Sequence, residues 1–290
     1  MSITNLSRIT LELNGEEARK KAATDPQVMN YIRAVQRRVD GFNLNFEPQY
    51  MARKITPSGG NTNSALGLLS LNDDLLELFS ITIGGTAYVY NTDIIPYPNS
   101  GQSPIRTLQI ANCCNGPLVS WYACCPATLL NSIVITGLWG MHRYYARQGF
   151  FASGGTCPAL DAVQRSFVVA GVNLSDPDIY NRAPMISPGN LIRVDNELME
   201  VVNTSIPDNS LTVLRGWRDT PIVTHAVGTS VQVYEPEEDI ANEATRQAGL
   251  MYARRGAFTA NTNYPDGSTV TYPSDLLWAL KHVIQQYNFE

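Results

Sequence analysis

Histidine is scarce in this sequence, and the familiar catalytic motifs are missing. The three histidines in 290 residues are His142, His225 and His282. The sequence contains no G-x-S-x-G elbow, no G-x-x-x-x-G-K-[ST] loop, no G-x-G-x-x-G and no H-E-x-x-H. A histidine base needs a partner that these scattered positions do not supply. The sequence therefore predicts no enzyme and no cofactor.

Charge is also limited, with no excess of basic residues. Charged residues make up 16% of the chain, and the formal net charge is -5. A dedicated nucleic-acid-binding protein carries a basic stripe or patch. The densest basic run, Arg19 to Lys21, directly follows Glu16 and Glu17, which is typical of a solvated helix face. This composition argues against a chain that wraps nucleic acid.

Long apolar runs are absent as well. The longest uncharged stretch, Thr107 to Met141, is interrupted by residues such as Asn112, Pro117 and Pro126. Because a membrane-spanning helix needs about 20 mostly apolar residues, we expect no membrane segment. Met1 to Gly15 mixes polar and apolar residues, so we also expect no secretory signal.

The cysteines occur as two adjacent pairs and one single residue: Cys113, Cys114, Cys124, Cys125 and Cys157. Neighbouring side chains on a strand point to opposite faces, so pairs without a gap are unsuited to zinc. The odd number argues against a disulfide framework. We expect reduced, mostly buried thiols and no metal site.

Two adjacent pairs of acidic residues, Asp73-Asp74 and Glu237-Glu238, leave a catalytic interpretation open, because paired carboxylates hydrolyse glycosides. Acidic residues are also favoured at helix N-termini, where they complement the helix dipole. We interpret both pairs as helix starts.

Helices are predicted near both ends of the chain. Asp25 and Pro26 are good starting residues for a helix over 26–39, which Gly41 would end. A second helix, over 236–255, has a face of mostly small residues that favours close helix packing: Ile240, Ala244, Ala248 and Met251. Apolar spacing predicts a last helix starting at Pro273 or Ser274.

Residues 186–234 give the clearest strand pattern. Short apolar runs at 190–194, 197–202, 211–214 and 230–234 are separated by turn residues. Strands at this regular spacing are typical of a small barrel or meander. The predicted fold class is thus α+β, with a helical connector core formed by both chain ends and an inserted antiparallel β domain, a small barrel or sandwich. The expected divisions are 1–110, 111–235 and 236–290.

The same region carries a resemblance to a known family. Pro188 to Val202, Ser210 to Gly216 and His225 to Thr229 resemble a recurring element of phage neck and tail-adaptor proteins. Its pattern begins with a glycine before a strand, followed by a hairpin that contains isoleucine-arginine, an acidic residue and a glutamate. The sequences "leucine-threonine-valine-x-arginine-glycine" and "histidine-x-x-glycine-threonine" come next. The loop from Trp217 to Pro221 departs from that pattern.

Three flanking segments are similar to elements of head–tail connector proteins of tailed bacteriophages. They are Leu71 to Ile83, Ile133 to Gly140 and Asp239 to Gly256. With the central motifs, they extend the resemblance over Leu66 to Gly256. Each motif is weak by itself, and the order in which they occur carries the resemblance.

The resemblance implies a structural virion protein: a head-to-tail adaptor ring in the phage neck, assembled in the host cytoplasm. Expected partners are the portal protein, neighbouring copies in a ring of about twelve and the next neck or tail component. Genomic DNA would pass through the channel without specific binding, and no membrane is involved. The ring would extend the DNA channel and give the tail its attachment platform.

The resemblance also suggests contact residues. The expected portal-docking residues are Asp275, Leu276, Leu280, Val283, Ile284, Tyr287 and Phe289. The expected inter-subunit contacts of the β module are Trp139, Trp217, Arg218 and His225.

Two other functions stay open at this point. One is a phage tail-tip or baseplate binding module that touches carbohydrate through Trp121 or Trp217. The other is a virion-associated hydrolase that uses His225 with a nearby carboxylate.

Overall fold

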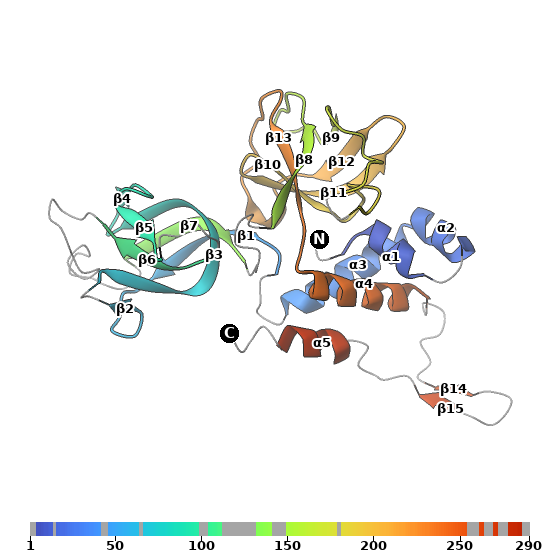
Figure 1. The fold of residues 1–290 in the computed structure, drawn as a ribbon, viewed down its shortest axis with the longest axis horizontal. Coiled ribbons are helices and arrows are strands. Elements are labelled where there is room, and N and C mark those ends of the chain that lie inside the picture. Colours follow the sequence, from blue (N-terminus) through green and yellow to red (C-terminus); the bar gives the residue numbers. More distant parts are fainter. Residues whose placement is uncertain are drawn as a thin grey trace. The chain divides into compact units, whose positions relative to one another are not determined.

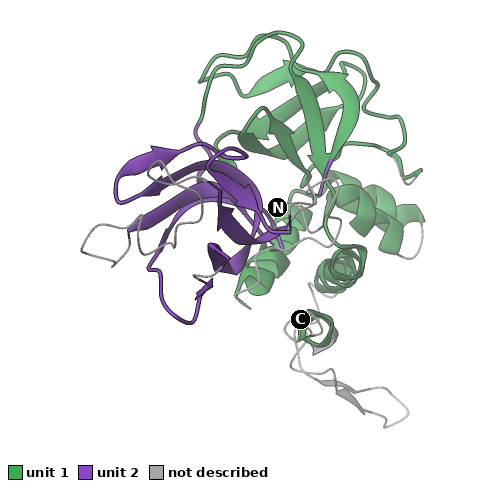
Figure 2. Ribbon diagram, turned by 60° about the vertical axis from the view of Figure 1, so that its left-hand side comes forward, with its two compact units in different colours: residues 1–43, 151–217, 222–290 green, residues 44–150, 218–221 purple. Residues whose placement is uncertain are grey.

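The structure is a computed structural model that describes residues 4–13, 16–41, 46–63, 66–98, 104–111, 132–140, 149–178, 181–253, 261–263, 269–271 and 278–285. The chain forms two compact units, each assembled from separate stretches of sequence (Figures 1 and 2). Unit 1 comprises residues 1–43, 151–217 and 222–290, and unit 2 comprises residues 44–150 and 218–221.

Unit 2 is built on a seven-stranded antiparallel sheet in the order β1-β7-β3-β6-β5, with β2 and β4 also paired to β3. Its strands are β1 (Gln49–Ile55), β2 (Thr62–Asn63), β3 (Leu68–Ile83), β4 (Thr86–Tyr88), β5 (Ile94–Pro96), β6 (Ile105–Ile110) and β7 (Ile133–Trp139). Gly84 and Gly85 form the turn between β3 and β4.

The core of unit 2 lies against β3 and β7 and includes the buried side chains of Leu75, Ile81 and Trp139. Trp139 donates its indole N–H to the backbone oxygen of Met51 at 3.1 Å. Gly137 is required where these strands meet, because a Cβ atom there would lie 2.2 Å from the backbone oxygen of Glu77.

Unit 1 contains a six-stranded antiparallel sheet in the order β8-β13-β10-β11-β12-β9. These strands are β8 (Phe150–Thr156), β9 (Ser166–Val168), β10 (Leu191–Val194), β11 (Glu197–Ser205), β12 (Ser210–Leu214) and β13 (Ser230–Tyr234). The sheet closes on itself, because Thr156 and Ala170 exchange two backbone hydrogen bonds of 2.9 Å. The last four of these strands occur where the alternating sequence pattern predicted them.

The helices of unit 1 are α1 (Leu6–Glu12), α2 (Glu16–Thr24), α3 (Gln27–Asp40), α4 (Glu238–Ala253) and α5 (Trp278–Gln285). Helix α4 lies against α1, α3 and α5 (Figure 1). The described residues also include the short 3-10 turn η1 (Trp217–Asp219), and the paired strands β14 (Asn261–Asn263) and β15 (Thr269–Thr271).

We call the closed six-stranded sheet of unit 1 the barrel. The start of α1 attaches the helices of unit 1 to this barrel. Asn5 caps the helix by accepting the backbone N–H of Arg8 at 2.9 Å, and Leu6 donates its backbone N–H to Pro188 at 2.9 Å. Gly189 has a φ of +95°, and a Cβ atom there would lie 3.2 Å from the Cα of Asn5. The glycine before the strand is therefore needed both for its backbone conformation and for the approach of α1.

The prediction of a helical connector core formed by both chain ends is wrong. Of the described residues, 38% are in strands and 26% in helices, and two antiparallel sheets make up most of the regular structure. The reason is that residues 49–110, expected to add only a strand and hairpin segment to that core, form most of a seven-stranded sheet. β3 alone runs for 16 residues and has partners along both of its halves.

The interpretation of Asp73-Asp74 as a helix start is also wrong. Both residues lie inside β3. Asp73 pairs with Arg53 at 3.1 Å, and Asp74 pairs with Arg106 at 2.7 Å. Cross-strand ion pairs thus account for this acidic pair. Glu237-Glu238 does stand at a helix start, since Glu238 is the first residue of α4.

Candidate functional site

A buried arginine is at the centre of the best-defined polar cluster in the barrel. Arg215 follows β12, and its side chain is 3% exposed. Its Nε and Nη2 donate to the two carboxylate oxygens of Glu197 at 2.6 and 2.7 Å. Nη1 donates to the backbone oxygens of Asp161 and Gln164 at 2.8 and 3.1 Å, and Nη2 donates to that of Val223 at 2.6 Å. All five N–H groups of the guanidinium therefore have an acceptor.

Glu197, the first residue of β11, is equally well satisfied. In addition to Arg215, its carboxylate accepts the backbone N–H groups of Gly216 at 3.0 Å and Val223 at 3.2 Å. Burial by itself would raise the pKa of this carboxyl, but the hydrogen bonds from Arg215, His225 and the backbone outweigh burial and lower the pKa. Glu197 is thus held as a carboxylate inside the barrel.

His225 completes the cluster. Its Nε2 lies 3.0 Å from Glu197, and its Nδ1 lies 2.7 Å from the carboxylate of Asp195. Both ring nitrogens of His225 therefore lie within hydrogen-bond distance of a carboxylate. The side chain of His225 is fully buried. The ring, expected to contact another subunit, instead connects two parts of its own barrel.

The cluster holds two loops side by side. Leu160 and His225 exchange backbone hydrogen bonds of 3.0 and 2.9 Å. Farther along, Gly228 donates to Cys157 at 2.9 Å, and Cys157 donates to Thr229 at 2.9 Å. We call the paired segments 157–164 and 222–229 the loop ribbon. Because the side chain of Arg215 also binds both segments, the ribbon has a defined backbone conformation.

A second polar cluster connects α1 to the far end of β13. Glu235 accepts from Arg8 at 3.0 Å and from Arg182 at 2.8 Å, and Arg182 also pairs with Asp178 at 2.8 Å. Here burial raises the pKa of Glu235, and the two arginines only partly oppose the increase. Glu238 lies at the exposed edge of this cluster.

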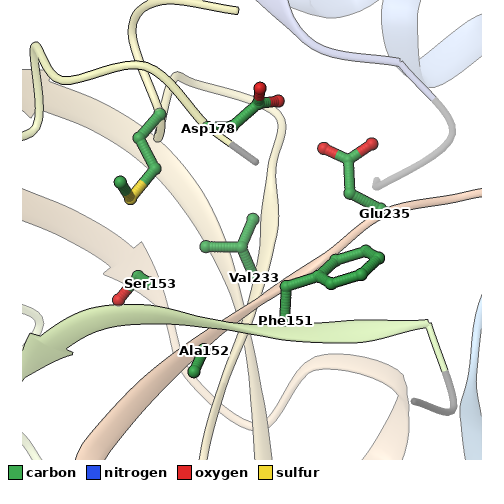
Figure 3. Close-up of a pocket in the computed structure, with 7 residues that line it drawn as sticks. Phe151, Ala152, Ser153, Asp178, Val233 and Glu235 are labelled. Atoms are coloured by element: carbon green, nitrogen blue, oxygen red, sulfur yellow. The ribbon is translucent and has the colours of Figure 1, made fainter. Parts of the chain in front are cut away.

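Next to Glu235 is a small pocket with a volume of about 30 Å³. Figure 3 shows Phe151, Ala152 and Ser153 along one strand, with Val233 and the carboxylates of Asp178 and Glu235 around them. The volume corresponds to about one or two water molecules. The pocket is therefore too small for a substrate or cofactor of ordinary size.

The other expected contact residues of the β module are Trp139, Trp217 and Arg218. Trp139 is buried in the core of unit 2. Arg218 belongs to the segment of unit 2 at 218–221, where its Nε donates to buried Glu47 at 3.0 Å, and its φ is +54°. Trp217 is half-buried. Trp139 and Arg218 thus belong to unit 2, whereas Trp217 and His225 belong to unit 1.

Three of the seven expected portal-docking residues lie in the described part of the chain. Leu280 and Ile284 are fully buried on α5, and Val283 is half-buried. Asp275, Leu276, Tyr287 and Phe289 lie outside the described residues. The docking role of this segment stays a prediction.

The expected packing face of α4 can be located directly. Ile240, Ala244, Ala248 and Met251 are all buried. They lie on the helix that contacts α1, α3 and α5. Small side chains at Ala244 and Ala248 allow neighbouring helices to come close.

Among the described residues, no group of His, Cys, Asp and Glu has the arrangement of a metal site. Cys157 is a free, buried thiol, and burial raises its pKa. The other four cysteines lie outside the described residues. No helix in the described part of the chain is long and apolar enough to span a membrane.

Comparisons of this chain with protein-family models, with curated proteins and with solved structures found no match.

Glu197 and Arg215 are the central residues that the sequence analysis did not single out as a site. They are 18 positions apart, since Glu197 is the first residue of β11 and Arg215 directly follows β12. The sequence did contain a signal for this cluster. Glu197, Arg215 with Gly216, and His225 occur in this order within the motifs that carry the family resemblance. The hypothesis of a buried Glu197–Arg215 ion pair in contact with His225 would have connected all three motifs.

Proposed function

We propose that this chain is a structural virion protein, a head-to-tail adaptor of the phage neck. It binds the portal protein and neighbouring copies of itself in a ring, extends the DNA channel and provides the platform for the tail. The proposal rests on the order of the resembling motifs along the chain.

One structural observation supports the proposal most directly. Glu197, Arg215 and His225 come from three separate motifs of the resemblance, and they meet in one hydrogen-bonded cluster. Gly189 and Gly216 from the same motifs have φ values of +95° and +64°, where glycine is favoured. The three motifs therefore form one folded module, in which these residues have a structural role.

The geometry also favours a structural role for His225 over a catalytic role in hydrolysis. A general base needs a nitrogen that reaches the substrate. Both ring nitrogens of His225 face carboxylates, and the side chain is fully buried. A His225→Ala variant that loses a measured lytic activity but keeps its fold would contradict the proposal.

The decisive experiment mixes the purified full-length chain with the portal protein of the same virion. We expect portal–adaptor complexes with rings of this chain in electron micrographs, and matching masses by mass photometry. The portal must be present, since an adaptor can stay monomeric until it meets the portal. Failure to bind portal, together with binding on a glycan array, would favour a tail-tip or baseplate module.

A further inference from the structure

A short segment in the chain of the barrel belongs to the other unit. Residues 218–221 are part of unit 2, whereas residues 217 and 222, directly before and after them, are part of unit 1. The segment lies between β12 and β13 in the sequence. We call residues 218–221 the strap.

The chain is fixed in unit 1 on both sides of the strap. Before the strap, Gly216 donates its backbone N–H to Glu197 at 3.0 Å. After it, Val223 donates its backbone N–H to the same carboxylate at 3.2 Å, and its backbone oxygen accepts from Arg215 at 2.6 Å. The Glu197–Arg215 ion pair therefore binds the backbone at both ends of the strap.

The strap itself is fixed within unit 2. Arg218 donates its Nε to the carboxylate of Glu47 at 3.0 Å, and the side chain of Glu47 is completely buried. Thr220 is only 4% exposed. Because a buried carboxylate is costly without its partner, the Glu47–Arg218 ion pair resists separation.

The backbone of the strap has an unfavourable conformation. Arg218 has a φ of +54° and Asp219 a φ of +64°, in the left-handed region that side chains with a Cβ atom rarely adopt. Such a conformation persists only where the surrounding structure imposes it. Only Trp217 lies between Arg218 and the fixed Gly216, so the chain between these two positions has almost no slack.

From these observations we infer that the strap is a mechanical link, through which a change at Glu47 in unit 2 alters the loop ribbon of unit 1. The ribbon is the receiving element because Val223 belongs to it, and because Arg215 also binds its other segment at Asp161 and Gln164. The inference goes beyond the proposed function and does not depend on it.

The test uses the full-length chain with Glu47→Met and Arg218→Met combined, so that no charge is left buried without its partner. The control is Leu108→Ala, which removes a fully buried side chain from the core of unit 2 and keeps the Glu47–Arg218 pair. Circular dichroism verifies that each variant folds.

Hydrogen exchange followed by mass spectrometry then measures the protection of backbone amides in the ribbon segment 157–164. This segment is far in sequence from all three substitutions. Its Leu160 amide is protected by a hydrogen bond to His225 at 3.0 Å.

We expect the amides of 157–164 to exchange about tenfold faster in the double variant, because local opening of the ribbon becomes easier. In the Leu108→Ala control they should exchange as in the wild type. Unchanged exchange in the double variant would overturn the inference, and so would an equal acceleration in the control.

A milder substitution decides the matter if the double variant does not fold. Glu47→Gln keeps the size of the side chain and an oxygen acceptor for Arg218 but removes the negative charge. We expect a smaller acceleration in the same ribbon segment, and its absence would equally overturn the inference. None of these results bears on portal binding, so the adaptor proposal is tested separately.

Discussion

Glu197 and Glu235 are two buried glutamates of the same unit, each paired with arginine, yet their pKa values shift in opposite directions. Both lose solvation on burial. For Glu197, the lost solvation is replaced by hydrogen bonds from the bidentate Arg215, from two backbone N–H groups and from a histidine. Glu235 is bound by two arginines through a single oxygen, and the negative charge of Asp178 adds to the increase in its pKa.

The difference shows that a nearby opposite charge does not by itself compensate for burial. A buried carboxylate is stabilised when its oxygens are surrounded by directed donors, and backbone N–H groups are donors that cannot move away. We therefore expect the Glu197 cluster to contribute strongly to the stability of the folded barrel. The Glu235 cluster is a more adaptable connection between the barrel and α1.

The largest expected effect is that of Arg215→Met. The change would leave Glu197 buried without its main partner and would release the carbonyl groups of both ribbon segments. Breaking one side of a buried ion pair costs about 3–5 kcal/mol. Urea unfolding of the variant and the wild type measures the difference. A loss below about 1 kcal/mol would show that the cluster does not specify the barrel.

A smaller effect is expected for Arg8→Met in the other cluster. Glu235 keeps Arg182, so the buried carboxylate is not left alone. We expect a loss of about 1–2 kcal/mol, within the usual range for a charged hydrogen bond. The same urea experiment measures this loss. If Arg8→Met were as damaging as Arg215→Met, the contrast between the two clusters would be wrong.

The two glutamates should also respond oppositely to acid. The folded-state pKa of Glu197 is lowered, so its stabilising contribution is complete above its ordinary value of 4.5 and is lost as the pH falls through the lower folded-state value. The folded-state pKa of Glu235 is raised, so its contribution to stability improves as the pH falls through that higher value toward 4.5.

Carboxyl ¹³C NMR titration of the wild-type chain tests this contrast without any substitution. We expect the midpoint of Glu197 below 4.5 and that of Glu235 above 4.5. Assignment uses the conservative variants Glu197→Gln and Glu235→Gln. Midpoints on the same side of 4.5 would remove the basis for the comparison.

The smallest effect is expected for an exposed pair that serves as reference. Arg246 on α4 binds Glu243 at 2.8 Å, and its side chain is 51% exposed. Arg246→Met should change the unfolding free energy by about 0–1 kcal/mol. A larger loss would mean that arginine substitution itself, and not burial of the partner, explains the Arg215 result.

Local sequence patterns were sufficient for elements whose structure depends on neighbouring residues. The strands over 191–234 follow short alternating runs between turn residues, and α3 follows a cap and a regular apolar face. Unit 2 was not predicted as a sheet. β1 pairs with β7 through residues that are 78 to 90 positions apart, a relation that no local sequence pattern contains.

The candidate site shows the same limit. The motifs with Glu197, Arg215 and His225 were visible in the sequence, but His225 was interpreted as a surface contact. Its environment depends on Asp195 and Glu197, which approach it only when β10, β11 and the loop ribbon pair.

By itself, the sequence determined the scarcity of histidine, the acidic balance, the turn positions of the barrel and the order of the motifs that resemble phage adaptors. The tertiary structure decided that strands outweigh helices, that His225 is buried and that Arg215 connects two loops. The physical reason is that propensity and periodicity act over a few residues. Burial of a charge, in contrast, is stable only where distant parts of the chain supply its hydrogen-bond partners.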